Sequence, residues 1–241
     1  MKSSVEYYPD YETIALPDQY LTIEIPSWDA VAQPTLETVL EQYKSIAHVN
    51  TDVLTDDMVA ALEIPNINSV SQLTQYAIDY FQKNSRQRKF YNEILPFLMA
   101  YYAEAAEVVI NSEEKEAYFD QYYDQLNQFA EEEEMDLETY GAQILNLAEP
   151  VMQGIEERAE EDFIFHLIAR KRYDEQGLKL DEEAYENFIH QNVLHQHADE
   201  IEIRDRLPYV KFKQMMPEML FTQNLYDFFT EKIRFVKQGE A

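Results

Sequence analysis

The chain has 241 residues and a formal net charge of −28, since 47 acidic residues outnumber 19 basic ones, and it contains no cysteine. The lack of cysteine excludes disulfides and thiolate catalysis, and the negative charge argues against nucleic acid and anionic membranes as partners. Glycine is scarce, at 4 residues, which limits tight turns, so we expect an all-α protein. These glycines have no spacing that could cradle a phosphate, so we expect no cofactor.

The N-terminal part of the chain is rich in proline and should be largely extended. Between Pro17 and Pro26, apolar and polar side chains alternate, which predicts a strand for which the sequence shows no obvious partner. Residues 35–47 have the spacing of a short amphipathic helix. We predict that residues 1–50 form an extended segment and this helix, which pack on a helical domain of residues 51–241.

Residues 69–110 keep one helical period for longer than any other stretch, and Ser69 suits the N-cap. Only Pro96 disturbs the pattern, and a kink or break is expected there because proline lacks the backbone N–H. As one helix, residues 69–107 would be about 58 Å long, which exceeds the diameter of about 45 Å expected for a compact domain of this length. Either the helix breaks at Pro96, or helices project from the body as arms.

The other segments with a helical period predict helices over residues 56–62, 111–134, 135–149, 150–176, 181–207 and 217–236. Asn111 and Glu114 have the spacing of a capping box, Asp181 suits an N-cap, and Gly177 suits the position just after a helix. No stretch is long and apolar enough to span a membrane, and the first residues lack the apolar core of a signal peptide. We therefore expect a cytoplasmic protein.

Three histidines that lie close together form the one candidate metal site. His190, His195 and His197 are followed by Asp199 and Glu200, a set that could hold zinc or nickel if the side chains converged. No two of these histidines have the four-residue spacing of a helical chelate, so we favour solvated surface histidines and leave metal binding open. No serine nucleophile motif occurs either, so we do not expect an enzyme.

Charge is distributed unevenly along the chain. Between Glu104 and Asp162 there are 19 acidic residues against Lys115 and Arg158, which indicates a solvated helix surface or, alternatively, an acidic face for basic partners. The cluster of basic residues that stands out is Lys83, Arg86, Arg88 and Lys89. We expect these basic residues to pair with the acidic helices, and nucleic-acid contact is the less favoured interpretation.

Aromatic and methionine side chains crowd the acidic segment and the C-terminal part of the chain. Most of those at helical spacing belong to the core, but neighbours such as Met215 and Met216 point to different faces, so some must be exposed or line a groove. Flexible methionine and amphipathic tyrosine suit adaptable binding surfaces. The candidate polypeptide-binding residues are Tyr101, Tyr102, Tyr118, Tyr122, Tyr123, Phe129, Met135, Tyr140, Met152, Phe212, Met215, Met216 and Met219.

The order of segments over residues 51–237 resembles the C-terminal chaperone domain of bacterial trigger factor. The segments that carry the resemblance are VLTDDMVAAL (53–62), SVSQLTQYAIDYFQKNSRQRKFYNEIL (69–95), DLETYGAQI (136–144), ERAEEDFIFHLIARKRYDEQGLKLDEEAYENFI (157–189) and FTQNLYDFFTEKI (221–233). The prolyl isomerase and ribosome-binding domains of that family have no counterpart here, so isomerase activity and ribosome docking are not expected.

The resemblance implies an elongated multi-helix fold in which helical arms protrude from a body and form a cradle. Its implied function is that of an ATP-independent chaperone, which holds unfolded or partly folded polypeptides and, given the acidic surface, favours basic clients. The alternative is a non-catalytic scaffold or adaptor that binds one specific folded protein. The expected partners are thus non-native polypeptides, with no nucleic acid and no membrane, and the sequence leaves a homodimer open.

Overall fold

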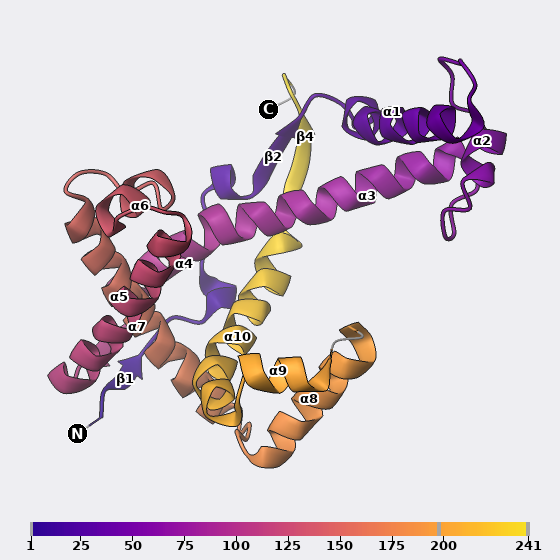
Figure 1. The fold of residues 1–241 in the computed structure, drawn as a ribbon. Helices are drawn as coiled ribbons and strands as arrows, with labels where there is room; N and C mark the ends of the chain where they lie inside the picture. Colours follow the sequence, from indigo (N-terminus) through magenta and orange to yellow (C-terminus); the bar gives the residue numbers. More distant parts are fainter. Residues whose placement is uncertain (1, 197–198, 240–241) are drawn as a thin grey trace. The chain divides into compact units, whose positions relative to one another are not determined.

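Helices dominate the fold, and the strands form two short sheets (Figure 1). The computed structural model describes the backbone of residues 2–196 and 199–239, and over these residues the chain is predominantly helical, as predicted. No helix in this part of the chain is long and apolar enough to cross a membrane.

The elements have the following bounds in chain order. The α-helices described are α1 (Trp28–Ala47), α2 (Asp56–Ala61), α3 (Val70–Lys89), α4 (Leu95–Ala105), α5 (Ser112–Glu132), α6 (Leu137–Gln143), α7 (Val151–Glu175), α8 (Glu182–Gln196), α9 (Glu200–Arg206) and α10 (Tyr209–Thr230). The strands are β1 (Ser4–Tyr7), β2 (Thr22–Ile25), β3 (Glu107–Val109) and β4 (Arg234–Lys237). Short 3₁₀ turns cover Tyr11–Thr13 and Asp18–Tyr20, and a π-helical turn covers Phe90–Ile94.

The chain divides into two compact units, and each consists of two separate chain segments. Unit 1 comprises the described residues of Met1–Ile14 and Leu95–Leu225. Unit 2 comprises those of Ala15–Ile94 and Tyr226–Ala241. The division into residues 1–50 and 51–241, which follows composition along the sequence, stays a prediction.

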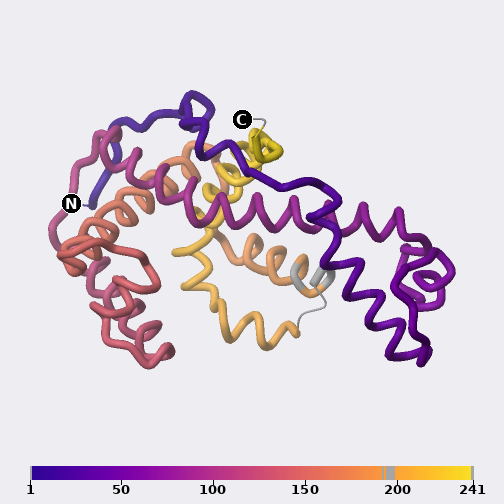
Figure 2. The backbone as a smooth tube through the Cα atoms, turned by 90° about the horizontal axis from the view of Figure 1, so that it is seen from above, coloured from indigo at the N-terminus to yellow at the C-terminus, as the bar shows by residue number. Residues whose placement is uncertain are grey.

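Unit 2 is built on α1 and α3, which contact each other and cross at an angle (Figure 2). Buried apolar side chains from α1, α2, α3 and the loop before α3 hold them together: Val39, Val59, Ile67 and Leu73. Helix α1 begins earlier than the predicted residue 35 because Ser27 caps it, and the Ala30 N–H donates to Ser27 Oγ at 3.1 Å. Pro34 therefore lies inside the helix, where it forgoes one backbone hydrogen bond.

Helical residues continue from α3 through Pro96, so of the kink or break predicted at this residue, the break does not occur. Between α3 and α4, the backbone forms the π-helical turn Phe90–Ile94, and Pro96 is the second residue of α4. A π-helical turn already departs from the usual bonding pattern, so it can accommodate a residue that has no N–H to donate. Phe90 and Ile94, both fully buried, anchor the turn.

Both sheets pair segments that are far apart in the sequence. In unit 2, β2 pairs in parallel with β4, with Ile23 opposite Phe235. In unit 1, β1 pairs antiparallel with β3, with Ser4 opposite Val109. The alternation before Pro26 therefore predicted a strand correctly, while its partner, about two hundred residues away along the chain, carries no local signal that identifies it.

Helix α7 is the central element of unit 1. It buries side chains along its whole length, from Val151 to Tyr173, and it packs against α4, α5, α6 and β1. The predicted cap of α5 is confirmed, since the Glu114 N–H donates to Asn111 Oδ1 at 2.8 Å. Near the end of α7, Lys171 Nζ donates to the carbonyl oxygen of Val5 at 2.7 Å and so ties β1 to this helix.

The C-terminal helices of unit 1 differ from the prediction in two ways. A single helix over 181–207 is wrong, because Asp199 caps a separate helix, α9, and accepts from the Ile201 N–H at 2.8 Å. The predicted start of the last helix at Pro217 is also wrong, since α10 begins at Tyr209 and contains Pro217. The chain leaves α10 after Thr230 and forms β4, a strand that was not predicted.

Candidate functional site

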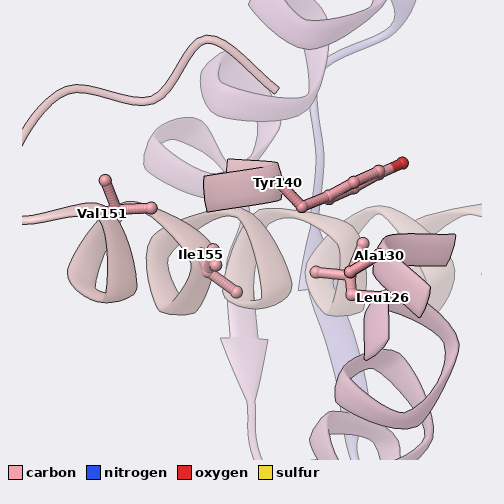
Figure 3. Packing of buried hydrophobic residues seen from close by; sticks show 5 residues of the cluster. All are labelled: Leu126, Ala130, Tyr140, Val151 and Ile155. Atoms are coloured by element: carbon pink, nitrogen blue, oxygen red, sulfur yellow. The ribbon is translucent and has the colours of Figure 1, made fainter. Parts of the chain in front are cut away.

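The N-terminal end of α7 forms a small hydrophobic cluster together with α5 and α6, and we call this cluster the first lobe. Its buried members are Leu126, Ala130, Tyr140, Val151 and Ile155 (Figure 3). Helix α6 approaches α7 closely at Gly141, where an added Cβ would lie 2.6 Å from Val151 Cγ1. Around this cluster, Phe129 is 39% exposed and Met152 is 43% exposed, so the lobe presents apolar side chains on its outside.

The other end of α7 carries a second cluster with α8 and α10, which we call the second lobe. Its buried members are Tyr173, Tyr185, Ile189, Phe212 and Met216. A tyrosine hydroxyl forms a hydrogen bond within the lobe: Tyr185 Oη donates to the carbonyl oxygen of Leu207 at 2.8 Å. On α10, Met215 is 39% exposed and Met219 is 43% exposed. Because they are four residues apart, these two methionines share one face of the helix.

The two lobes are separated by the length of α7. Val151 in the first lobe and Tyr173 in the second are 22 residues apart on one helix, which corresponds to about 33 Å at 1.5 Å per residue. Helices α5 and α6 lie at one end of α7, and α8 and α9 lie at the other (Figure 1). Unit 1 therefore has two small cores, each with exposed apolar side chains, on one shared helical spine.

A polar cluster lies between the lobes and joins α5, α7 and α10. Tyr118 Oη donates to Asp162 Oδ2 at 2.7 Å, and His166 Nδ1 is hydrogen-bonded to the carboxylate of Glu218. Burial raises the pKa of the Asp162 carboxyl and that of the Tyr118 hydroxyl. Each of these four side chains has its partner within the cluster, which is the arrangement of a structural polar network.

Aromatic rings form the contact of α4 with α7 and α10. The ring of Tyr102 lies 6.3 Å from that of Phe165 and 5.7 Å from that of Phe221, measured between centroids. Tyr102 Oη is buried and has no hydrogen-bond partner among the described residues. Burial raises the pKa of this hydroxyl.

The candidate binding residues fall into three groups by burial. The buried ones are Tyr102, Tyr140, Phe212 and Met216. The half-buried ones are Tyr101, Tyr118, Tyr122, Tyr123 and Met135. The exposed ones are Phe129, Met152, Met215 and Met219. The buried side chains form helix contacts inside unit 1, so only the exposed and half-buried ones can contribute to a binding surface.

Some exposed apolar residues of unit 1 were missed by the sequence analysis. Among them are Ile144 after α6, Ile201 on α9, and Val210 and Leu220 on α10. These four are aliphatic, whereas the candidate set was chosen for aromatic and methionine side chains; Tyr7, also exposed, lies outside the acidic and C-terminal segments that were searched. A search for aliphatic residues without a matching helical stripe could have found Ile201, which lies among charged residues in the short segment EIEIRDR.

The histidine cluster is only partly visible. His190 is exposed on α8, while the side chain of His195 and the whole of His197 lie outside the described residues. Among the side chains that the structure does describe, no three histidine, aspartate or glutamate residues lie close enough to hold a metal ion.

The basic residues of α3 make contacts within unit 2. Lys89 Nζ forms an ion pair with Glu93 at 2.6 Å, and the Arg86 guanidinium lies 5.2 Å from the ring centroid of Phe235. Part of the cluster thus takes part in local pairing and stacking, and its pairing with the acidic helices of unit 1 stays a prediction.

Comparisons with protein-family models, with curated proteins and with solved structures find no match for this chain.

Proposed function

We propose that the protein is an ATP-independent chaperone that binds unfolded or partly folded polypeptides through the exposed apolar side chains of unit 1. The observation that carries the proposal is the pair of lobes at the two ends of α7, each with exposed methionine or aromatic side chains. A span of about 33 Å corresponds to about ten extended residues. A client segment of that length could contact both lobes at once, as in the helical cradle that the resemblance to trigger factor implies.

The composition of these surfaces suits clients of varied sequence. Methionine has a flexible, polarisable side chain that adapts to irregular apolar surfaces, and both Met215 and Met219 belong to one exposed face. The surrounding helices are strongly acidic, with Glu131, Glu132 and Glu133 exposed at the end of α5 and just after it. Basic clients should therefore bind faster and more tightly than acidic ones, and added salt should weaken this preference.

The test is suppression of aggregation when a chemically unfolded client is diluted into buffer and followed by light scattering. At equimolar ratio, the protein should suppress aggregation of a basic client more strongly than that of an acidic client of similar size. The double variant Met215→Ser, Met219→Ser should lose most of the effect. The control is Ile46→Ser, Val53→Ser, which removes two apolar side chains of unit 2 that are even more exposed than the two methionines.

Two outcomes would contradict the proposal. If the protein suppresses aggregation of no client at low salt, the chaperone function is wrong. If the unit 2 control loses as much activity as the methionine variant, the assignment to the lobes is wrong. The alternative function, a scaffold or adaptor for one folded partner, would instead give a single stoichiometric partner in a pull-down in place of many unrelated clients.

A further inference from the structure

Strand β2 has one edge that pairs with β4 and one that does not. The Gln238 N–H donates to the carbonyl oxygen of Ile25 at 2.9 Å, so the backbone groups of Ile25 face β4. Backbone groups of successive strand residues point to opposite sides, and therefore those of Thr22 and Glu24 face away from β4. Among the described residues, these outward N–H and C=O groups have no hydrogen-bond partner.

A cavity of about 360 Å³ runs along this free edge. Its strand side is formed by Thr22, Ile23 and Glu24 of β2. Its opposite wall is the C-terminal half of α3 with the following π-helical turn, which contribute Phe81, Ser85, Arg88, Lys89, Asn92 and Glu93. Four of these wall residues, Phe81, Ser85, Arg88 and Asn92, follow each other at intervals of three or four and so form one continuous helix face. Figure 1 shows β2 beside β4, with α3 passing close to both.

We propose that the free edge of β2 binds an extended polypeptide segment, which adds to the β2–β4 sheet as a third strand. A row of unpaired backbone groups is a template for such pairing. The proposal names a second client site, in unit 2, and depends on the proposed function only in taking its occupant to be a non-native chain.

The side chains around the cavity define which segment fits. The face of β2 that carries Ile23 also carries its neighbour Phe235 on β4, and Phe235 contacts Phe81 of α3 at 6.2 Å between ring centroids. Side chains of an added strand that point to this face would meet Phe81 and the Arg88 guanidinium. Arg88 has no ion pair with any described residue, whereas Lys89 is paired with Glu93. The fitting segment therefore carries apolar residues and one carboxylate on the face that meets α3.

A second copy of this chain is a poorer occupant of the same edge. Each copy carries a net charge of −28, and like-charged partners repel each other on approach. Symmetric pairing of two β2 strands would also exclude a carboxylate from the position facing Arg88, because the side chains of β2 on the α3 face are Ile23 and Ile25. An extended segment of another chain fits both the backbone edge and the unpaired guanidinium.

The test uses a fluorescein-labelled decapeptide that alternates valine with threonine and has aspartate in place of one central valine, with binding followed by fluorescence anisotropy. Glu24→Pro removes one outward N–H but leaves the backbone bonds to β4 intact, so affinity should fall about tenfold. Arg88→Glu should weaken binding of the aspartate peptide about tenfold. It should weaken binding of the peptide in which valine is restored at the aspartate position much less. On binding, the Glu24 amide should gain protection from hydrogen exchange, and the Ile23 amide should change little.

A proline variant that unfolds would be recognised by circular dichroism, and the wild-type protein then provides the same test with a decapeptide N-methylated on the pairing edge. Undiminished binding of the N-methylated peptide, or of the folded Glu24→Pro variant, would overturn the proposal, and so would sedimentation as a dimer that excludes the peptide. The aggregation assay is independent of these measurements. A protein that binds the decapeptide but suppresses no aggregation would refute the proposed function and leave the strand-addition site standing.

Discussion

Replacing Tyr102 by phenylalanine should stabilise the protein even though it removes a polar group from the core. The Tyr102 side chain is fully buried, and its hydroxyl has no hydrogen-bond partner among the residues described. A buried polar group left without a partner costs about 1–3 kcal/mol, because the same group is hydrated in the unfolded chain. Loss of the oxygen leaves a void of a single atom, so we take the low end and expect a gain of about 1 kcal/mol in the free energy of unfolding.

Tyr118 provides the matched control, since it is also a tyrosine of unit 1 that packs against α7. Its hydroxyl donates to Asp162 Oδ2 at 2.7 Å, and hydrogen bonds to charged groups contribute about 1.5–3 kcal/mol. Tyr118→Phe leaves the Asp162 carboxylate without this donor, so the free energy of unfolding should fall by about 1.5 kcal/mol. The same chemical change thus has opposite signs at the two positions.

Urea denaturation followed by circular dichroism at 222 nm measures both variants. Fluorescence of Trp28, the single tryptophan, is less suitable, because Trp28 belongs to unit 2 and both substitutions lie in unit 1. The comparison requires equal slopes of free energy against urea in the two variants and the wild type. A decrease of 1 kcal/mol or more for Tyr102→Phe would show that its hydroxyl has a partner in solution and would refute the reasoning.

Two further pairs of substitutions test the packing and the charges of unit 1. Gly141→Ala should lower the free energy of unfolding by about 1–3 kcal/mol in the same urea assay, because its Cβ would lie 2.6 Å from Val151 Cγ1. Gly177→Ala meets no neighbour but has a φ of 65°, so it should cost only about 1 kcal/mol, and a larger effect at Gly177 than at Gly141 would contradict the packing argument. Burial raises the pKa of Asp162. The charged form of this carboxyl is therefore disfavoured in the folded protein, and the free energy of unfolding rises as the pH falls through its folded pKa. Asp162→Asn should therefore stabilise the protein at pH 7 and lose this advantage in acid. The Thr139 N–H lowers the pKa of Asp136, so Asp136→Asn should destabilise the protein at pH 7 and lose this disadvantage in acid.

Local signals in the sequence located most helix starts correctly. Ser69 and Asn111 were identified as caps from their place before a helical stripe, and in the structure both accept from the backbone N–H three residues ahead. Asp181 does the same at the start of α8, accepting from the Ala184 N–H at 2.9 Å. Such caps depend on the residue and on its next few neighbours, so they can be predicted from the sequence.

The failures concern features that depend on distant residues or on proline. Pro34 and Pro217 were taken as helix boundaries, and a kink or break was expected at Pro96, yet all three lie inside helices. Proline forbids one hydrogen bond but does not fix where a helix ends when packing on both sides favours its continuation. The pairing of β2 with β4 depends on backbone groups from the two ends of the chain, and no local pattern encodes such a register.

The candidate site could be predicted only in part, for a similar reason. Composition identified the segments that carry exposed methionine and aromatic residues, but periodicity did not separate Met215, which is exposed, from Met216, which is buried in the second lobe. The two differ by one position on the same helix. Which of them faces the core depends on where α7 and α8 pack against α10, and the sequence does not specify those contacts.

The strong negative charge has a physical role that follows from the exposed apolar surface. A protein that presents Phe129, Met152, Met215 and Met219 to solvent is at risk of binding its own copies, since exposed apolar patches promote association. A net charge of −28 opposes this by repulsion between copies, while it attracts basic chains to the same helices. Under the proposed function, the charge and the exposed methionines would therefore be complementary: the charge would oppose self-association, and the methionines would supply the apolar contacts to a client.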